Sequence, residues 1–410
     1  MRRNRFKLLA LTLSAASVLA ACAEDDATPI APVAPSVGGE LFTRYVSLGQ
    51  SNTAGLMSAG INDSTQHLPY PVLLARKAGA GERFFVPSLE MPGCPPPLLG
   101  PQPLTSQRVG GGTATTCALR APENLPFVSN LAVPSSRIVD WVNNGLPDTR
   151  SNALTTLILG GRTQLQAMRD ANPTFVSVWP EGNDVLGAAA AGVPAAATSQ
   201  AAFEAALDQI VAGIKAEGAQ ALFMSVLNVP LVAPALQPGA YYFALQAAGQ
   251  SPKPVSPNCA PGTPGGSSLV SFGLLTDPSV AVISCNATDP GVLSPAEIGD
   301  VTARVNAYNA ALKARADANG WAYLDVNAVA MTQVLNDPNK LRKCQGLATA
   351  TLATFAQAVA ATCPGPTAPN FWGSFMSFDP IHFNAQLHQL IANEAARAIN
   401  GKFGTTLPTS

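Results

Sequence analysis

The segment QAAFEAALDQIVAGIKAEGAQALFMSVLNV, residues 200–229, decides the fold class. After Gly218, an apolar run extends from Ala219 to Val229 and stops before Pro230, which is typical of a buried strand. A helix that leads directly into a buried strand is the repeating unit of a parallel sheet covered by helices. The preceding part, 200–217, predicts that helix because its apolar residues recur at helical spacing, at Phe203, Leu207, Ile210, Val211 and Ile214.

The same alternation of strands and helices continues on both sides of this unit. The pattern therefore predicts an α/β fold with a parallel sheet, whose ligand site lies beyond the carboxyl ends of the strands. Two segments, 230–293 and about 330–375, are interpreted as loop-rich insertions. The other predicted strands are 43–48, 82–86, 174–179 and 321–329, and the other predicted helices are 71–78, 154–170, 295–318 and 385–400.

The first 22 residues have the features of an export signal. Four cations near the N-terminus precede an apolar stretch from Leu8 to Ala21, which is too short for a transmembrane helix. The stretch ends in Leu-Ala-Ala-Cys, which resembles the bacterial lipobox and implies that Cys22 becomes the lipidated first residue of the mature chain. The alternative is an ordinary secretory signal that is removed together with Cys22. Both interpretations predict an exported protein.

The mature chain would begin with a tether and continue with one folded domain. Residues 23–40 are rich in Ala, Pro and acidic residues, and they contain too little apolar surface to pack, so we expect a flexible spacer. The domain would cover residues 41–405. Without the four cations of residues 1–22, 20 Lys and Arg face 25 Asp and Glu, a net charge of about −5. This charge argues against a nucleic-acid partner.

The cysteines that remain after residue 22 are even in number, and in an exported protein this predicts disulfides. Six cysteines allow 15 connectivities. Pairing between sequence neighbours is the simplest, because each pair then lies within one loop-rich segment. A zinc site is the alternative, but there is no CxxC pair and no cluster of histidines. The predicted disulfides are Cys94–Cys117, Cys259–Cys285 and Cys344–Cys363.

Four short segments carry groups that are suited to acyl-transfer chemistry. Ser51 offers a hydroxyl nucleophile at a strand-to-helix turn. His382 offers a base, and Asp379, three residues earlier, can orient it through Nδ1. Asn183 offers an amide N–H to a developing oxyanion, and the segment that ends at Ser135 offers a backbone N–H. The segments are GQSN at 49–52, NLAVPS at 130–135, GND at 182–184 and DPIH at 379–382.

Each of these segments also has a purely structural interpretation. Ser51 alone is consistent with an N-cap serine at an ordinary turn. Asn183 stands in an Asn-Asp pair, which is common in turns after strands. A single histidine is usually structural or exposed, and the neighbouring Asp379 is what favours a functional role for His382. No role is assigned to the remaining histidines, His67 and His388.

Taken together, the segments resemble the SGNH (GDSL-type) hydrolase superfamily over about residues 43–400. GQSN is similar to the first sequence block of that family, in the variant with Gln in place of the commoner Asp; GND is similar to the third block and DPIH to the terminal Asp-x-x-His. The resemblance implies a three-layer α/β/α fold with a central flavodoxin-like parallel sheet, and no metal or organic cofactor. It implies that Ser51 is the nucleophile, His382 the base and Asp379 its orienting carboxylate. It also implies three oxyanion donors, Ser51, Ser135 and Asn183.

The sequence departs from the family pattern at two positions. Ser135 stands where the family usually has glycine, so the backbone N–H is kept but the freedom to adopt positive φ is reduced. Glu181 stands where the third block has its glycine, whereas Asn183 keeps its place.

The expected function is that of an exported, lipid-anchored serine esterase that acts on a lipid ester or on an acylated small molecule or sugar. Ala23, which follows Cys22, would favour the outer membrane in a bacterium with two membranes. Two alternatives remain open. The GQSN variant, which some sugar esterases share, suggests a carbohydrate O-deacetylase. The altered second block and the two insertions suggest a non-catalytic SGNH-like surface binding protein.

Overall fold

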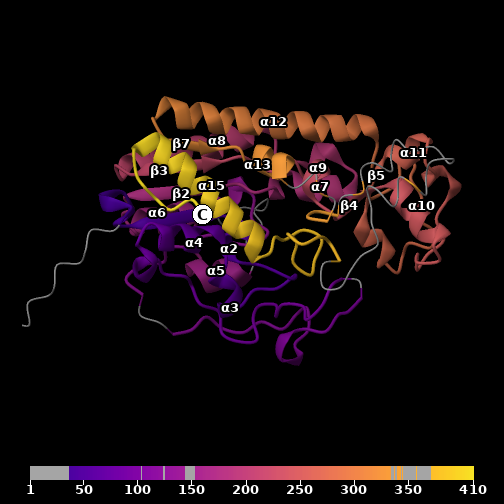
Figure 1. Cartoon of the computed structure of the whole chain (residues 1–410), viewed down its shortest axis with the longest axis horizontal. Coiled ribbons are helices and arrows are strands. Elements are labelled where there is room, and N and C mark those ends of the chain that lie inside the picture. Colours follow the sequence, from indigo (N-terminus) through magenta and orange to yellow (C-terminus); the bar gives the residue numbers. More distant parts are fainter. Residues whose placement is uncertain are drawn as a thin grey trace, which may run out of the picture. The chain divides into compact units, whose positions relative to one another are not determined.

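The computed structural model describes residues 37–102, 104–122, 125–143, 153–333, 337, 339–342, 344, 357 and 371–410 (Figure 1). The predicted export signal with Cys22, most of the predicted tether, and Cys363 lie outside the described residues. No helix in these ranges combines the length and the apolar character needed to cross a membrane.

A parallel sheet of four strands lies at the centre of the fold. Gly49, the last residue of the first strand, pairs with Trp179, the last residue of the second. Because all neighbours run parallel, the carboxyl ends of the strands lie at one edge of the sheet. The predicted α/β fold class is thus confirmed. The strand order is β1 (Tyr45–Gly49), β2 (Phe175–Trp179), β3 (Gln220–Met224) and β7 (Ala322–Leu324).

Alternate residues of the strands face two separate hydrophobic cores, one on each side of the sheet. Tyr45 and Phe175 pack on the side that is covered by α4 (Tyr70–Lys77) and α15 (Ala385–Phe403). Their neighbours Val46 and Val176 pack on the opposite side, under the helices whose bounds follow. Strands β1 and β2 are buried at every position, because both faces of the sheet are covered. The helices of the second side are α6 (Gln164–Asp170), α8 (Gln200–Ala216) and α12 (Pro295–Ala318), of which α8 and α12 lie side by side in Figure 1.

Several helices begin where the sequence predicts. Ser294 forms a capping box with Glu297 at the start of α12. Helix α15 follows the N-cap Asn384 but continues to Phe403, and Gly404 rather than Gly401 ends it. The predicted helix over 154–170 is instead two helices, α5 (Ala153–Leu159) and α6, because Gly160 and Gly161 both adopt positive φ between them.

Three strand predictions need correction. The chain at 82–86 forms no strand. The strand predicted at 219–229 ends at Met224, because the side chain of Asn309 bonds both the N–H and the C=O of Val226. The strand predicted at 321–329 ends at Leu324, because the carboxylate of Asp325 accepts the N–H groups of residues 327 and 328 and starts α13 (Val326–Gln333).

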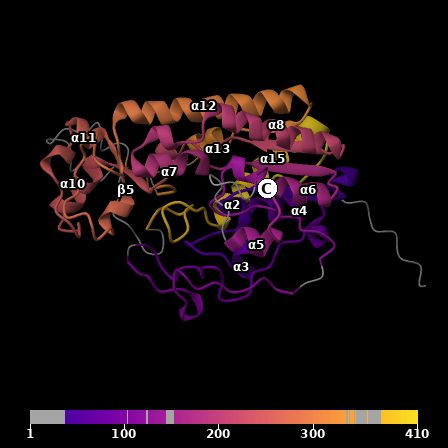
Figure 2. The same cartoon turned by 180° about the vertical axis from the view of Figure 1, so that it is seen from behind.

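The insertion 230–293 is more ordered than predicted. It contains an antiparallel sheet of β4 (Leu236–Pro238), β5 (Leu269–Ser271) and β6 (Val292–Leu293). Two helices accompany the sheet, α10 (Gly239–Ala247) and α11 (Pro264–Ser267). Figure 2 shows these elements together at the end of the domain opposite to α6.

Two of the three predicted disulfides lie wholly within the described residues, and both are present. Cys259–Cys285 closes a loop within the first insertion, and Cys94–Cys117 closes a loop in the irregular segment after β1. Cys344 is also disulfide-bonded, but its predicted partner Cys363 lies outside the described residues.

The remaining described helices are α2 (Ser51–Ala54), α3 (Asp63–Gln66), α7 (Asn183–Ala191) and α9 (Val229–Val232), with 3-10 turns η1 (Gly39–Phe42), η2 (Gly81–Arg83), η3 (Val109–Gly111), η4 (Ile138–Trp141), η5 (Pro194–Ala196), η6 (Pro257–Cys259) and η7 (Phe272–Leu275).

Candidate active site

Ser51 is the first residue of the short helix α2, directly after β1. The buried carboxylate of Glu181 accepts hydrogen bonds from the N–H groups on either side of it, those of Gln50 (3.1 Å), Asn52 (2.7 Å) and Thr53 (2.6 Å). Within the described ranges, neither the N–H nor the hydroxyl of Ser51 has a hydrogen-bond partner. The turn therefore leaves one backbone donor, that of Ser51, available beside a free hydroxyl.

The side-chain carbonyl of Gln50 makes the reciprocal contact, from the loop after β1 to the loop after β2. The Oε1 atom of Gln50 accepts the N–H groups of Gly182 (3.0 Å) and Asn183 (2.9 Å), which begin helix α7. The loop after β1 thus caps the helix after β2, while Glu181 from the loop after β2 caps the helix after β1. This exchange satisfies the otherwise unpaired N–H groups of two helix starts and fixes the two loops against each other.

Two buried carboxylates support this exchange. Burial raises the pKa of Glu181, and the hydrogen bonds from the α2 turn oppose the shift. Burial also raises the pKa of Asp184, to about 6, against hydrogen bonds that include the N–H of Ile138. Asp184 further accepts the Nε2–H of Gln50 at 3.3 Å. Asp184 therefore stabilises the loop, which agrees with the structural interpretation of the Asn-Asp pair as a turn.

The second predicted block lies beside β1. Ser47 and Asn130 form a parallel bridge, and the N–H of Val133 reaches the carbonyl of Gly49 at 3.3 Å. This pairing carries the chain to Ser135, which adopts a left-handed conformation with φ of +66°. The serine thus takes the backbone conformation that a glycine would take more easily. In the described structure the N–H of Ser135 has no partner.

Asn183 connects the second and third blocks. Its Nδ2–H donates to the carbonyl of Ser136 at 3.0 Å. An amide nitrogen carries two hydrogens, so this bond orients the side chain and leaves the second N–H available. The hydrogen bond to Ser136, the residue after Ser135, therefore holds Asn183 close to Ser135.

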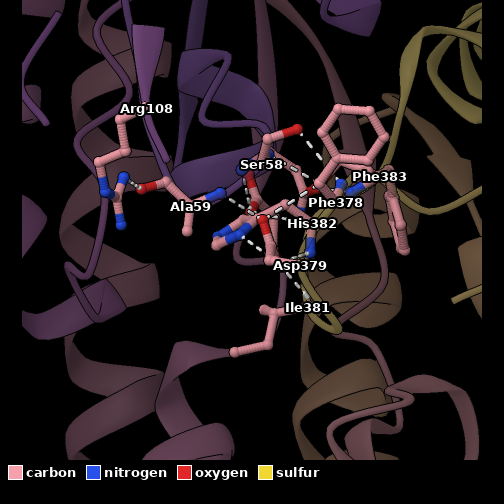
Figure 3. Close-up of polar contacts among 11 residues, drawn as sticks. Ser58, Ala59, Arg108, Phe378, Asp379, Ile381, His382 and Phe383 are labelled. Atoms are coloured by element: carbon pink, nitrogen blue, oxygen red, sulfur yellow. Dashed lines mark hydrogen bonds and ion pairs between the residues drawn. The ribbon is translucent and has the colours of Figure 1, made fainter. Parts of the chain in front are cut away.

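Asp379 and His382 form a close pair on the loop before α15 (Figure 3). Oδ1 of the carboxylate lies 2.9 Å from Nδ1 of the imidazole and also accepts the N–H of His382 (2.8 Å) and of Ile381 (2.9 Å). Nε2 of His382 has no hydrogen-bond partner among the described residues. The pair thus has the orientation that a general base requires.

The electrostatics of the pair are reciprocal. Burial alone would raise the pKa of Asp379, but the charge and hydrogen bonds of His382 hold it below its usual value. Burial alone would lower the pKa of His382, but the charge and hydrogen bond of Asp379 outweigh it and raise that pKa. The histidine side chain is 13% exposed, so it remains in contact with solvent.

One hydrogen bond joins this pair to the serine turn. The N–H of Phe383 donates to Oδ1 of Asn52 at 2.9 Å, so the residue after His382 bonds the residue after Ser51. The Nδ2–H of Asn52 donates to Glu181 at 3.1 Å. Segments more than 300 positions apart in the sequence therefore meet at the edge of the sheet.

A narrow cavity of about 30 Å³ opens between these segments, with Ser51 and Asn183 in its lining. The rest of its wall is mainly apolar. In the described residues, no three His, Cys, Asp or Glu side chains gather as metal ligands would. The apolar wall consists chiefly of Leu186, Leu227, Val229, Val232, Ile381 and Phe383.

The structure places Ser51, Ser135, Asn183 and the Asp379–His382 pair on loops that hydrogen bonds join, and it adds three residues without a predicted role: Gln50, Asn52 and Glu181. Their signal was present in the sequence, since all three are polar and follow strands that are otherwise apolar. The other two histidines have structural surroundings. His388 is buried, its Nδ1 accepts the N–H of Tyr70, and burial lowers its pKa to about 3. His67 is exposed and lies 3.4 Å from Asp63.

No protein-family model matches the chain, and no curated protein matches it. Among solved structures, an acetyl xylan esterase aligns with 87% of this chain and 99% of its own, at 12% identity and a TM-score of 0.33. An acetylxylan esterase from Geobacillus stearothermophilus aligns over 90% and 96%, at 11% identity and 0.35. An extracellular lipase from Streptomyces rimosus aligns over 90% and 97%, at 16% identity and 0.33. Similarity of this size assigns no activity to the chain.

Proposed function

We propose that this chain is an exported serine esterase that hydrolyses carboxylic esters through Ser51, His382 and Asp379. The observation that carries the proposal is the hydrogen bond of 2.9 Å between Asn52 and Phe383, because it holds the neighbours of Ser51 and His382 together. A hydroxyl without a partner and an oriented imidazole, on two loops that this bond joins, are the groups that nucleophilic catalysis needs.

The reaction takes place in two steps. The Oγ atom of Ser51 attacks the ester carbonyl carbon while Nε2 of His382 takes the hydroxyl proton. The tetrahedral intermediate collapses, the C–O bond to the alcohol breaks, and the alcohol leaves with the proton from His382. Water then attacks the acyl-enzyme with His382 again as base, which releases the carboxylic acid and restores Ser51. Asp379 orients the ring and stabilises its charge throughout.

The oxyanion of both tetrahedral intermediates is held by three N–H donors. Those of Ser51 and Ser135 are backbone groups without partners in the described structure, and the third is the free N–H of the Asn183 amide. Donors that are fixed before the reaction are worth several kcal/mol to the transition state, because they do not have to reorganise. The positive φ of Ser135 supports its role, since it allows this N–H to stay unpaired.

The dimensions of the cavity favour a short acyl group. A volume of about 30 Å³ with aliphatic walls suits an acetyl group better than a long chain. We therefore place acetyl and other short-chain esters first among the substrates. The same observation favours the second candidate, a carbohydrate O-deacetylase, because the ester that it hydrolyses carries an acetyl group.

Hydrolysis of nitrophenyl esters from acetate to octanoate tests the proposal. We expect turnover that is fastest for acetate, and a loss of at least a thousandfold in Ser51→Ala with an unchanged melting temperature. A fluorophosphonate probe should label Ser51 in the wild-type protein. Stoichiometric binding without turnover would support a binding protein, and labelling of a different serine would contradict the assignment. Acetylated xylan and acetylated lipids in the same assay would identify the alcohol.

Export is consistent with the disulfides Cys94–Cys117 and Cys259–Cys285, which persist in oxidising compartments. We propose that lipid on Cys22 anchors the domain at the cell envelope. Residues 23–40 would then let the active site reach substrate away from the membrane surface.

A further inference from the structure

A turn at Ser58 and Ala59, far from Asp379 in the sequence, contacts the catalytic carboxylate from outside the catalytic loop. The second oxygen of Asp379, Oδ2, accepts the N–H of Ala59 at 2.6 Å and the hydroxyl of Ser377 at 3.1 Å. The three bonds to Oδ1 all come from residues 381 and 382, so they follow from the local turn. The bond from Ala59 is different, because it spans 320 positions of the sequence.

Ala59 reaches Asp379 through a strained turn. Ser58 and Ala59 have φ values of +56° and +51°, and the flanking residues Met57 and Gly60 bond each other in both directions. Two consecutive positive φ values define a tight hairpin turn that ordinarily contains Asn or Gly. This region is sterically unfavourable for residues other than glycine, so the surrounding structure must impose the conformation.

Ser58 bonds Ser377 and Phe378 of the catalytic loop, and three contacts from residues 96–108 hold the other side of the turn. Nη1 of Arg108 donates to the carbonyl of Ala59 at 2.9 Å and to that of Pro96 at 2.6 Å. The N–H of Leu98 donates to the carbonyl of Ser58 at 2.8 Å. Gly60 is pressed against the same segment, since a Cβ there would lie 2.4 Å from backbone atoms of residues 96 and 97. Figure 3 shows Arg108 and Asp379 on opposite sides of Ala59.

Arg108 is unusual in its surroundings. It is only 8% exposed, and no carboxylate among the described residues lies within ion-pair distance of it. Its guanidinium donates to two carbonyl groups, and Asp379 is the acid whose charge acts on it. Burial of a cation without an adjacent carboxylate costs free energy, and hydrogen bonds to two carbonyl groups offset that cost only in part. The position of Arg108 is therefore expected to serve the site.

We propose that Arg108 is a positioning residue for catalysis. It fixes the Ser58–Ala59 turn, and the N–H of Ala59 in turn holds the carboxylate of Asp379 in the orientation that bonds His382. The inference rests on the proposed esterase function for its catalytic consequence, but the placement of Asp379 is measurable without it. Arg108 touches no reacting atom. It acts on the second carboxylate oxygen, which keeps only the hydroxyl of Ser377 as a donor when Ala59 moves away.

A double-mutant cycle with Asp379→Asn tests the catalytic part. We expect Arg108→Met to lower kcat for nitrophenyl acetate at least tenfold with KM within threefold, and by less than twofold when Asp379→Asn is already present. Arg108→Lys should recover part of the loss, because one donor is kept. Arg76→Met, at an exposed arginine, is the matched control and should have no effect. An equal loss in both backgrounds would show a purely structural role and overturn the proposal.

Proton NMR tests the positioning itself, independently of turnover. The Nδ1–H of His382, bonded to a carboxylate, should give a far-downfield resonance that disappears in Asp379→Asn and in His382→Ala. Arg108→Met should shift or broaden this resonance, and an unchanged resonance would overturn the proposal. If Arg108→Met does not fold, Arg108→Lys takes its place in both measurements. Absence of any esterase activity in the wild type would refute the proposed function, whereas the resonance would still decide the role of Arg108.

Discussion

The amide of Asn52 accepts the N–H of Phe383 through Oδ1 and donates to Glu181 through Nδ2. One side chain therefore joins the strand-to-helix turn that carries Ser51, the loop after β2 and the loop that carries His382. The three segments belong to distant parts of the chain. Their alignment depends on this short set of hydrogen bonds more than on any contact between Ser51 and His382 themselves.

Replacement of Asn52 by Ala should loosen this alignment. The N–H of Phe383 loses its acceptor, whereas Glu181 keeps the backbone N–H of residue 52; a buried donor without a partner costs about 1–3 kcal/mol. We expect kcat for nitrophenyl acetate to fall at least tenfold, and the free energy of unfolding in urea to fall by about 2 kcal/mol. Asn306→Ala, at an exposed asparagine of α12, is the control and should change neither. Full activity in Asn52→Ala would contradict this role.

The pH dependence of kcat/KM should follow His382. The base acts only as neutral imidazole, and Asp379 raises the pKa of this ring above 6.5 despite its burial. Activity should therefore fall with decreasing pH, with a midpoint above 6.5. In Asp379→Asn, the charge that raises the pKa of His382 is absent while the burial that lowers it remains. The midpoint should therefore move to lower pH, and the maximal kcat/KM should fall. A midpoint that does not move would show that the two side chains are not coupled.

The same pair stabilises the folded state over a pH range that is limited at both ends. The folded pKa of His382 is raised, so its contribution is complete below 6.5 and is lost as pH rises through the folded value. The folded pKa of Asp379 is lowered, so its contribution is present above 3.8 and is lost as pH falls through the folded value. Urea unfolding of wild type and His382→Ala at several pH values should give a difference that shrinks towards alkaline pH.

Glu181→Gln should damage the serine turn while keeping the shape of the side chain. Both carboxylate oxygens accept N–H groups of the turn, and a glutamine offers one acceptor and places an NH₂ group against the other donors. We expect a loss of about 2 kcal/mol in stability and at least tenfold in kcat. Glu90→Gln, at an exposed glutamate, serves as the control in the same unfolding and activity measurements.

Ser135→Gly should be tolerated or favourable. Residue 135 has a φ of +66°, which glycine adopts without the steric cost that serine bears. The backbone N–H is unchanged, so kcat/KM should stay within twofold while the melting temperature stays level or rises. A large loss of activity would mean that the serine side chain, rather than its N–H, serves the reaction.

Cys22→Ser should release the protein from membranes into the soluble fraction, because stable anchoring depends on the attached acyl chains. The measurement is fractionation followed by detection of the domain, together with mass analysis of the mature N-terminus. Retention in the membrane would show that a different feature anchors the chain. A mature N-terminus that lacks Cys22 would show an ordinary secretion signal.

The sequence by itself determined the elements and the chemistry. Helical spacing in 200–217 and the apolar strand after Gly218 predict an α/β fold, because burial on two faces leaves a distinct pattern of apolar residues. The local Asp379-Pro380-Ile381-His382 turn predicts its own hydrogen bonds, since they span only three residues. Strand ends were less predictable, because the side chains of Asn309 and Asp325 decide them from outside the strand pattern.

Only the tertiary structure decided how the site is held. The exchange between Gln50 and Glu181, the bond from Asn52 to Phe383, and the path from Arg108 through Ala59 to Asp379 join residues between 49 and 331 positions apart. No local pattern records such contacts, because side chains of this kind are compatible with many partners. The positive φ of Ser135 also depends on the tertiary structure. The serine side chain disfavours this conformation, and the pairing of residues 130–133 with β1 imposes it. Long-range packing fixes what local propensity leaves open.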